Sequence, residues 1–164
     1  MKKFVIRKQV LTFLLLVVTT SSAWCELISD PLKTLTIDAP KGWTSTTDGD
    51  SLVLVAPGET ASLVVGSRGP IPLKDSSQIK SIIEALAADG WKVTKQAPAS
   101  ISGVPAIKVD IDGTSGDVAG DRGFFYLVSD ENRGWLIFGL ATKKDASRVL
   151  PSLDSAVRNM RLVR

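Results

Sequence analysis

The feature that most constrains the fold is a pair of apolar runs separated by a short polar segment. Gly123–Val128 contains three consecutive aromatic residues, and Trp135–Leu140 follows after a polar segment that ends in Gly134. Two runs of strand length joined in this way predict a β-hairpin. Because nearly every position of both arms is apolar, rather than every second one, both faces of the sheet should be covered here. The hairpin is therefore expected at the centre of a sheet, with helices against it.

Shorter runs before the hairpin supply the other strands. Alternation of polar and apolar residues predicts strands with one solvated face at 34–38 and 107–111, the first of them at a sheet edge. Further strands are expected at 52–56, 62–66 and 91–95, separated by turns rich in glycine, proline and aspartate. Strands are clustered along the chain instead of alternating with helices, which favours a mainly antiparallel sheet.

Two segments have helical patterns. The first is expected close to 76–89, with Asp75 as its N-cap and Gly90 as its C-terminal stop. The second, 146–160, has an apolar face but contains Pro151, so it should start close to this residue or kink at it. The chain is therefore predicted to have an α+β fold: a mainly antiparallel sheet of about six to seven strands flanked by two helices, in the order βββα-ββββ-α.

The N-terminus has the three-part layout of a secretory signal peptide. Four basic residues lie within the first eight positions, an apolar run spans 10–18, and small residues precede Ala23. A signal peptide at 1–23, cleaved near Ala23, predicts export across a bacterial inner membrane and a periplasmic or secreted protein. An uncleaved anchor is the alternative, but the run is shorter than the roughly 20 residues of a spanning helix. We expect a disordered lead-in at 24–33 and a single domain at 34–164.

Charge and cysteine content narrow the classes of function. Without residues 1–23, 16 of the 20 basic residues remain against all 17 acidic ones, so the exported protein is close to neutral. Nucleic acid is therefore not an expected partner. Cys25 is the only cysteine, and the bulky Trp24 ahead of it disfavours lipidation; a signal cut after Cys25 would remove the thiol. A single cysteine builds neither an intramolecular disulfide nor a multi-cysteine metal site.

No residue pattern selects an enzyme class. Gly49–Leu52 spells the GDSL motif of an esterase family, but the chain has no histidine to activate Ser51. The motif also leads into a strand, so a tight turn is the preferred interpretation. Neither a phosphate-binding glycine loop nor a dinucleotide fingerprint is present. The protein is predicted not to be an enzyme, and no cofactor is expected.

A glycine-rich segment offers candidate metal ligands. Asp110, Asp112, Asp117 and Asp121 supply carboxylate oxygens on a flexible loop, and such ligands suit calcium. Their spacing does not match the helix-loop-helix calcium pattern. In the alternative interpretation, Asp110 and Asp112 lie on the solvated face of a strand and the other two belong to a solvated hairpin loop.

Tryptophans are the first candidate contacts for a protein partner, because this residue is common at interaction hot spots. Trp91 and Trp135 fall in predicted strands and are expected in the core. Trp43 lies in a loop after the first predicted strand. It is the best candidate for an exposed aromatic residue.

Basic residues in the last quarter of the chain are the second candidates. Lys143, Lys144 and Arg148 precede or begin the final helix, where they could meet an acidic partner or anionic lipid. Further basic residues, at 158, 161 and 164, have a structural alternative: they complement the negative end of the last helix.

Two short motifs carry a resemblance to a known superfamily. Ile37–Trp43 has a proline-glycine-tryptophan turn, and Ile101–Ala106 has a glycine-proline turn. With the element order and the closing helix, these segments resemble the PsbP-like superfamily over roughly residues 33–163. Its members include a lumenal photosystem subunit, a nuclear-import factor that binds the GTPase Ran, and bacterial envelope proteins and effector chaperones. The resemblance implies a non-catalytic domain that binds or helps to assemble other proteins.

These inferences favour an exported, non-enzymatic module that recognises another protein of the cell envelope or outside the cell. Two alternatives stay open. The first is a small ligand or calcium bound through the loop 110–122, and the second is a hydrolase that uses carboxylates.

Overall fold

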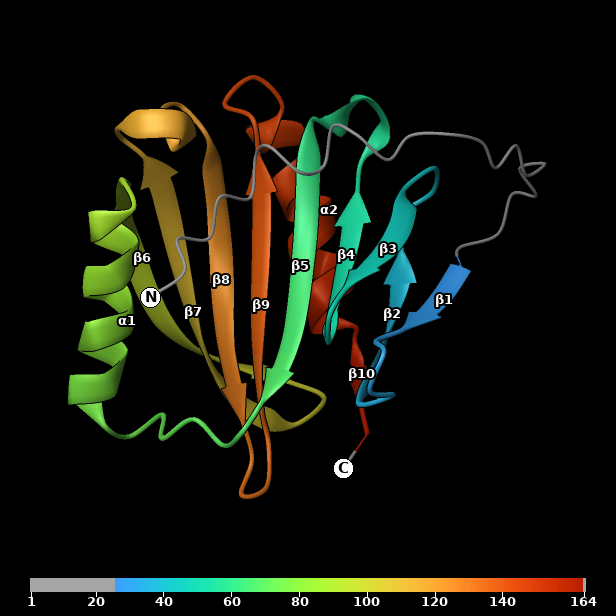
Figure 1. Ribbon diagram of the computed structural model, residues 1–164, viewed down its shortest axis with the longest axis vertical. Helices are drawn as coiled ribbons and strands as arrows, with labels where there is room; N and C mark the ends of the chain where they lie inside the picture. The colour runs from blue at the N-terminus through green and yellow to red at the C-terminus, as the bar shows by residue number, and fades with distance from the viewer. Residues whose placement is uncertain (1–25, 164) are drawn as a thin grey trace.

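The computed structural model describes residues 26–163. The predicted signal peptide at 1–23, its cleavage near Ala23 and the fate of Cys25 lie outside the described residues. Residues 26–163 form two α-helices and two β-sheets (Figure 1). Within this range no helix is long and apolar enough to cross a bilayer.

The larger sheet has seven strands in the order β3-β4-β5-β9-β8-β7-β6, and every neighbouring pair is antiparallel. The prediction of a mainly antiparallel sheet is confirmed. Its strands are β3 (Thr44–Asp48), β4 (Ser51–Val55), β5 (Ala61–Arg68), β6 (Trp91–Ile101), β7 (Val104–Gly113), β8 (Arg122–Ser129) and β9 (Gly134–Ala141).

The predicted hairpin lies at the centre of this sheet. Strands β8 and β9 pair with Val128 opposite Trp135, and each arm has a further neighbour on its other side, β7 and β5. The arms approach their surroundings closely. A Cβ atom at Gly139 would lie 2.7 Å from the ring of Phe124, so this position needs glycine.

Three short strands form a second sheet, in the order β1-β2-β10. They are β1 (Glu26–Ser29), β2 (Leu35–Ala39) and β10 (Arg161–Leu162). The strand predicted at 34–38 exists, but it belongs to this sheet and not to an edge of the larger one. The disordered lead-in expected at 24–33 is wrong for β1, which pairs with β2 along its whole length. Four residues are too few to show a reliable alternation of polar and apolar side chains. Pairing with β2 therefore determines that this segment is a strand.

Strand β3 corrects a second expectation, since no strand was predicted between 34–38 and 52–56. All five residues of β3 are exposed. It pairs with β4 across a turn at Gly49, whose φ is +56°. Threonine favours extended backbone. A strand without a buried face, however, shows no alternation of polar and apolar residues, so the sequence pattern does not predict it.

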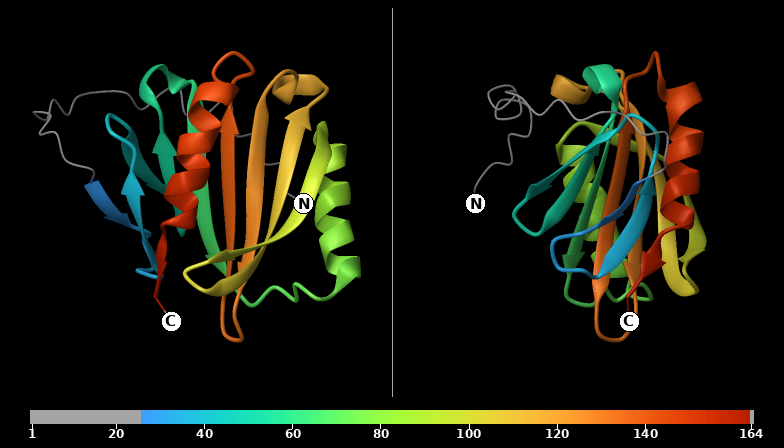
Figure 2. Two further views of the ribbon diagram at one scale, coloured as in Figure 1. Left: turned by 180° about the vertical axis from the view of Figure 1, so that it is seen from behind. Right: turned by 90° about the vertical axis from the view of Figure 1, so that its right-hand side faces the viewer.

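The two helices lie against opposite faces of the larger sheet (Figure 2). Helix α1 (Ser76–Ala88) begins as predicted, with the Asp75 carboxylate accepting a hydrogen bond from the Ser77 amide at 2.9 Å. Helix α2 (Ala146–Arg158) starts five residues before Pro151 and accommodates the proline on its exposed side.

Each helix covers its own hydrophobic core. On the α2 side, Leu153 and Val157 pack with residues such as Tyr126 and Trp135, which are fully buried. The core on the α1 side includes residues of α1 and the strands beneath it: Ile79, Trp91, Val109, Ile111, Phe125 and Leu127. The burial of Trp91 and Trp135 confirms that both belong to the core.

A buried polar network joins the small sheet to the hairpin. The Asp30 carboxylate accepts hydrogen bonds from the Thr34 hydroxyl at 2.8 Å and the Leu35 amide at 2.8 Å. The Thr34 hydroxyl in turn accepts one from the Trp135 indole at 3.1 Å. All of these polar groups are satisfied, so the network orients β2 against β9 without leaving a buried donor unpaired.

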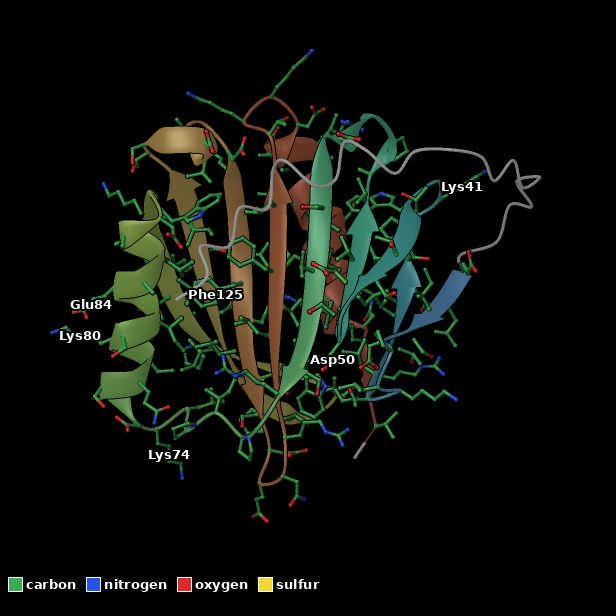
Figure 3. The ribbon with its side chains drawn as sticks, viewed as in Figure 1. Lys41, Asp50, Lys74, Lys80, Glu84 and Phe125 are labelled. Carbon is green, nitrogen blue, oxygen red and sulfur yellow. The ribbon has the colours of Figure 1, made fainter. Side chains whose placement is uncertain are left out.

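Helix α1 covers only part of its face of the larger sheet. One row of paired residues crosses five neighbouring strands on this face. From β4 through β5, β9 and β8 to β7, its members are Val53, Val64, Phe138, Phe125 and Val109. Phe125 and Val109 are buried, whereas the other three are half-buried. Figure 3 shows Phe125 on this face. The expectation that both faces of the hairpin are covered therefore holds fully for β8 and only partly for β9.

Candidate functional site: two hollows beside helix α2

Helix α2 separates two hollows in the surface of the protein. Its residues Val149, Leu153 and Val157 follow helical spacing and are buried against the sheet. Residues on the two flanks of this buried stripe face different neighbours. Arg148 and Ser152 line a hollow toward the β2–β3 turn, and Arg158 lines a pocket over β6, β7 and β8. We call them the Trp43 hollow and the Lys108 pocket.

The Trp43 hollow has a volume of about 240 Å³ and is bounded by three segments far apart in the sequence. Its lining residues are Pro40, Trp43, Ala56, Thr60, Arg148, Val149 and Ser152. A turn sets the place of the tryptophan: its amide donates to the Pro40 carbonyl at 3.1 Å, and Gly42 adopts a φ of +81°. A turn with a positive φ at its third residue favours glycine there, because glycine has no side chain to clash in this conformation. Trp43 is half-buried and packs on the α2-side core.

Arg148 is the charged wall of the Trp43 hollow. Its guanidinium donates to Asp145 at 2.8 Å, while 73% of the side chain remains exposed. Hydrogen bonds from Arg148 and Thr142 hold the pKa of Asp145 below its ordinary value. The structure thus brings two of the four predicted partner-binding residues, Trp43 and Arg148, to one hollow. Lys143 and Lys144 are exposed in the turn before α2 and do not line it.

The Lys108 pocket is organised around one carboxylate. Asp154 of α2 accepts hydrogen bonds from the Tyr126 hydroxyl at 2.6 Å and the Lys108 ammonium at 2.8 Å. Its second oxygen lies 2.8 Å from the Arg158 guanidinium. Lys108 is also 3.4 Å from Asp110. Because Lys108 and Asp154 are only 20% and 18% exposed, water screens this ion pair less than a surface pair.

The environment determines the protonation state of this cluster. Burial raises the pKa of Asp154, but hydrogen bonds from Lys108 and Tyr126 outweigh it, and the pKa lies below its ordinary value of 3.8. Burial, followed by the hydrogen bond to Asp154, raises the pKa of Tyr126 well above its ordinary value. At neutral pH the aspartate is therefore ionised and the phenol is protonated. Neither group has a pKa suited to proton transfer near pH 7.

The pocket itself has a volume of about 230 Å³ and a floor of small residues. Ala97 and Ala99 of β6 lie opposite Lys108 and Ala106 of β7, on the same face of the sheet as α2. Since α2 covers the centre of that face and the alanines are short, the sheet is left hollow toward β6. Lys95 stands at the exposed side of the pocket.

Sequence reasoning missed this cluster. Lys108 falls in the strand predicted at 107–111 with one solvated face, and Arg158 was placed either among the basic residues for a partner or at the negative end of the last helix. The spacing of Asp154 and Arg158, four residues apart on one helix, was the available signal. It could not indicate that Lys108 and Tyr126 arrive at the same carboxylate, because those contacts depend on strand register.

The four predicted metal ligands are not gathered at one point. Asp110 pairs with Lys108, and Asp112 lies 3.5 Å from Arg122 on the neighbouring strand. Asp117 is in the short 3-10 helix after β7, and Asp121 precedes β8. Among residues 26–163, no group of three or more acidic, histidine or cysteine side chains is placed to hold a metal ion.

The fold is shared with known proteins, although no protein-family model and no curated protein sequence matches the chain. The cyanobacterial PsbP protein, CyanoP, of Synechocystis sp. PCC 6803 aligns with 92% of this chain and 99% of its own, with a TM-score of 0.66 and 15% identity. LpqN of Mycobacterium tuberculosis, a protein involved in cell envelope biogenesis, aligns with 79% of this chain and 83% of its own, with a TM-score of 0.60 and 11% identity. PA94 of Pseudomonas aeruginosa aligns with 86% and 97%, with a TM-score of 0.51 and 15% identity.

The chain therefore has a PsbP-like fold, as the resemblance of its two turn motifs implied. At these identities the likeness extends to the fold alone, because one fold hosts many functions.

Proposed function

We propose that this protein is an exported, non-enzymatic module that recognises another protein of the cell envelope or outside the cell. The observation that carries the proposal is the Trp43 hollow. A half-buried tryptophan and an exposed arginine, 105 positions apart in the sequence, line the same hollow. Tryptophan and arginine are the side chains most enriched at the energetic centres of protein interfaces.

The chemistry of the Lys108 pocket supports a role in binding rather than in catalysis. A general acid at neutral pH needs a carboxyl group whose pKa is raised, and a nucleophile needs a base that takes its proton. Asp154 has a lowered pKa and is neutralised by two cations. The Tyr126 hydroxyl donates its proton to that same carboxylate and is not activated.

Export is part of the proposal, and it rests on the layout of residues 1–23. The fold is compatible with this proposal, because LpqN, which shares it, is involved in cell envelope biogenesis.

Site-specific cross-linking in living cells tests the proposal. A photo-reactive phenylalanine analogue in place of Trp43 should give a discrete adduct with one envelope protein, and Arg148→Ala should weaken that adduct. The matched control places the same analogue at Lys80, which points away from the sheet on the opposite side of the molecule (Figure 3). The proposal fails if both positions give the same adducts, or if Trp43 gives none while the protein is exported and folded.

A further inference from the structure

The Lys108 pocket contains more positive than negative charge. Three cations, Lys95, Lys108 and Arg158, line it, and two carboxylates, Asp110 and Asp154, neutralise them in part. The ion pairs account for Lys108 and Arg158. Lys95 forms no ion pair within residues 26–163. The cluster therefore has one positive charge in excess.

Hydrogen-bond donors remain available beside that excess charge. The Arg158 guanidinium has five N–H donors in a planar fork. One of its nitrogens pairs with Asp154, and 61% of the side chain remains exposed. Lys108 has three donors, of which its two carboxylate partners use two. A single carboxylate entering the pocket would meet donors from both residues and from Lys95. A dianion such as phosphate fits less well, since Asp110 and Asp154 would repel its second charge.

The floor of the pocket is apolar and suits the stem of a side chain. Ala97 and Ala99 contribute methyl groups next to the cations. A free inorganic anion would leave this surface uncovered, whereas the methylene groups of a glutamate side chain would bury part of it. The pocket thus combines a carboxylate receptor with a short apolar contact.

The neighbouring sheet edge limits how a partner can approach. Strand β6 is at the end of the sheet, and Pro98 in its middle has no N–H to donate to an added strand. A partner segment is therefore recognised here through side chains and not by extending the sheet.

We propose that the Lys108 pocket binds the carboxylate of an acidic side chain on a partner protein, with glutamate as the preferred residue. This rests on the proposed function, but it concerns a separate surface on the other flank of α2. Lys95 and Arg158 provide the new contacts, Lys108 contributes its remaining donor, and Asp154 neutralises part of the charge of Lys108 and Arg158.

Titration by nuclear magnetic resonance tests the proposal with small probes. An acetylated and amidated Gly-Glu-Gly peptide should cause saturable shifts of the backbone amides of residues 95–97, 99 and 100 at millimolar concentration. The Gly-Gln-Gly peptide should cause none, and acetate and phosphate should bind more weakly. Lys95→Gln combined with Arg158→Gln should weaken peptide binding by about ten-fold, as expected for lost hydrogen bonds to a charged group.

Two control proteins separate this pocket from general surface charge and from the Trp43 hollow. Lys74→Gln combined with Lys80→Gln removes two exposed charges near and on α1 (Figure 3) and should leave the affinity unchanged. Trp43→Ala should also leave it unchanged, so failure of the proposed function does not imply failure here. Equal weakening by the α1 variant, equal shifts with the glutamine peptide, or tighter binding of phosphate than of the glutamate peptide would overturn the proposal.

Asp154→Asn provides a test with the opposite sign. The asparagine keeps an acceptor for Tyr126 but releases Lys108 and Arg158 from a negative charge, so the glutamate peptide should bind at least about three-fold more tightly. A purely structural role for Asp154 predicts equal or weaker binding. Thermal unfolding confirms that the variant is folded before the titration. Weaker binding by a folded Asp154→Asn protein would contradict the pocket as described.

Discussion

The two flanks of helix α2 differ in how their charges are satisfied. On the Trp43 side, the arginine pairs with an aspartate one turn away on the same segment, and its side chain remains 73% exposed. On the Lys108 side, one carboxylate joins residues of β7, β8 and α2 and is 18% exposed. The first arrangement is local and leaves an aromatic surface free for a partner. The second is long-range, so the same charges that form a pocket also hold the helix on the sheet.

The largest expected effect tests that difference directly. Asp154→Ala should lower the free energy of unfolding by about 2–3 kcal/mol, because Lys108 and Tyr126 lose a charged acceptor in a partly buried place. Asp145→Ala, the matched change on the other flank, should cost clearly less, because Arg148 is exposed and local. Urea unfolding measures both values. Equal losses would contradict the contrast between a local and a long-range carboxylate.

A smaller effect on stability is expected at the Trp43 hollow. Trp43→Ala should lower the free energy of unfolding by about 1–2 kcal/mol, since the indole is only half-buried and leaves an open surface rather than a closed cavity. Trp135→Ala, at a fully buried position, is the comparison and should cost considerably more. If Trp43→Ala were as damaging as Trp135→Ala, the residue would belong to the core and its value as a binding candidate would be lost.

The smallest effect is in the dependence of stability on pH. Because the pKa of Asp154 is lowered in the folded protein, its stabilising contribution is fully present above its ordinary value of 3.8 and is lost as the pH falls through the folded value. The difference in unfolding free energy between the wild type and Asp154→Asn should therefore be constant above pH 3.8 and shrink below it. Acid-series urea unfolding measures this difference.

Tyr126→Phe sharpens the pH experiment. It removes one hydrogen bond that lowers the pKa of Asp154, so the folded-state pKa should lie closer to 3.8, and the loss of stability should be smaller and should end at a higher pH than in the wild type. A difference between the wild type and Asp154→Asn that continued to grow as the pH fell would show that the carboxylate is not stabilised by its partners.

The strongest sequence patterns predicted the parts of the fold that depend on burial. The apolar runs 123–128 and 135–140 form the central hairpin, and Asp75 caps α1 where helical spacing begins. Elements with little burial were missed. Strand β3 is exposed at every residue, and β1 is almost fully exposed, so neither has an apolar period to detect.

The two candidate sites also differ in how far the sequence could predict them. Trp43 was found because a turn motif precedes a large aromatic residue, and the structure adds Arg148 to the same hollow. The Lys108 pocket was not found. Its residues come from β6, β7, β8 and α2, and each one separately resembles an ordinary surface residue.

The amino-acid sequence by itself determined the class of fold, the central hairpin and the two helices, because apolar periodicity and helix caps act between residues close in the chain. Tertiary structure alone decided which charges meet. Strand register determines which residues lie opposite Lys108. The packing of α2 on the sheet determines that Asp154 reaches Lys108. Ion pairs between distant segments leave no period in the sequence, so only the packed protein shows that one carboxylate serves three partners.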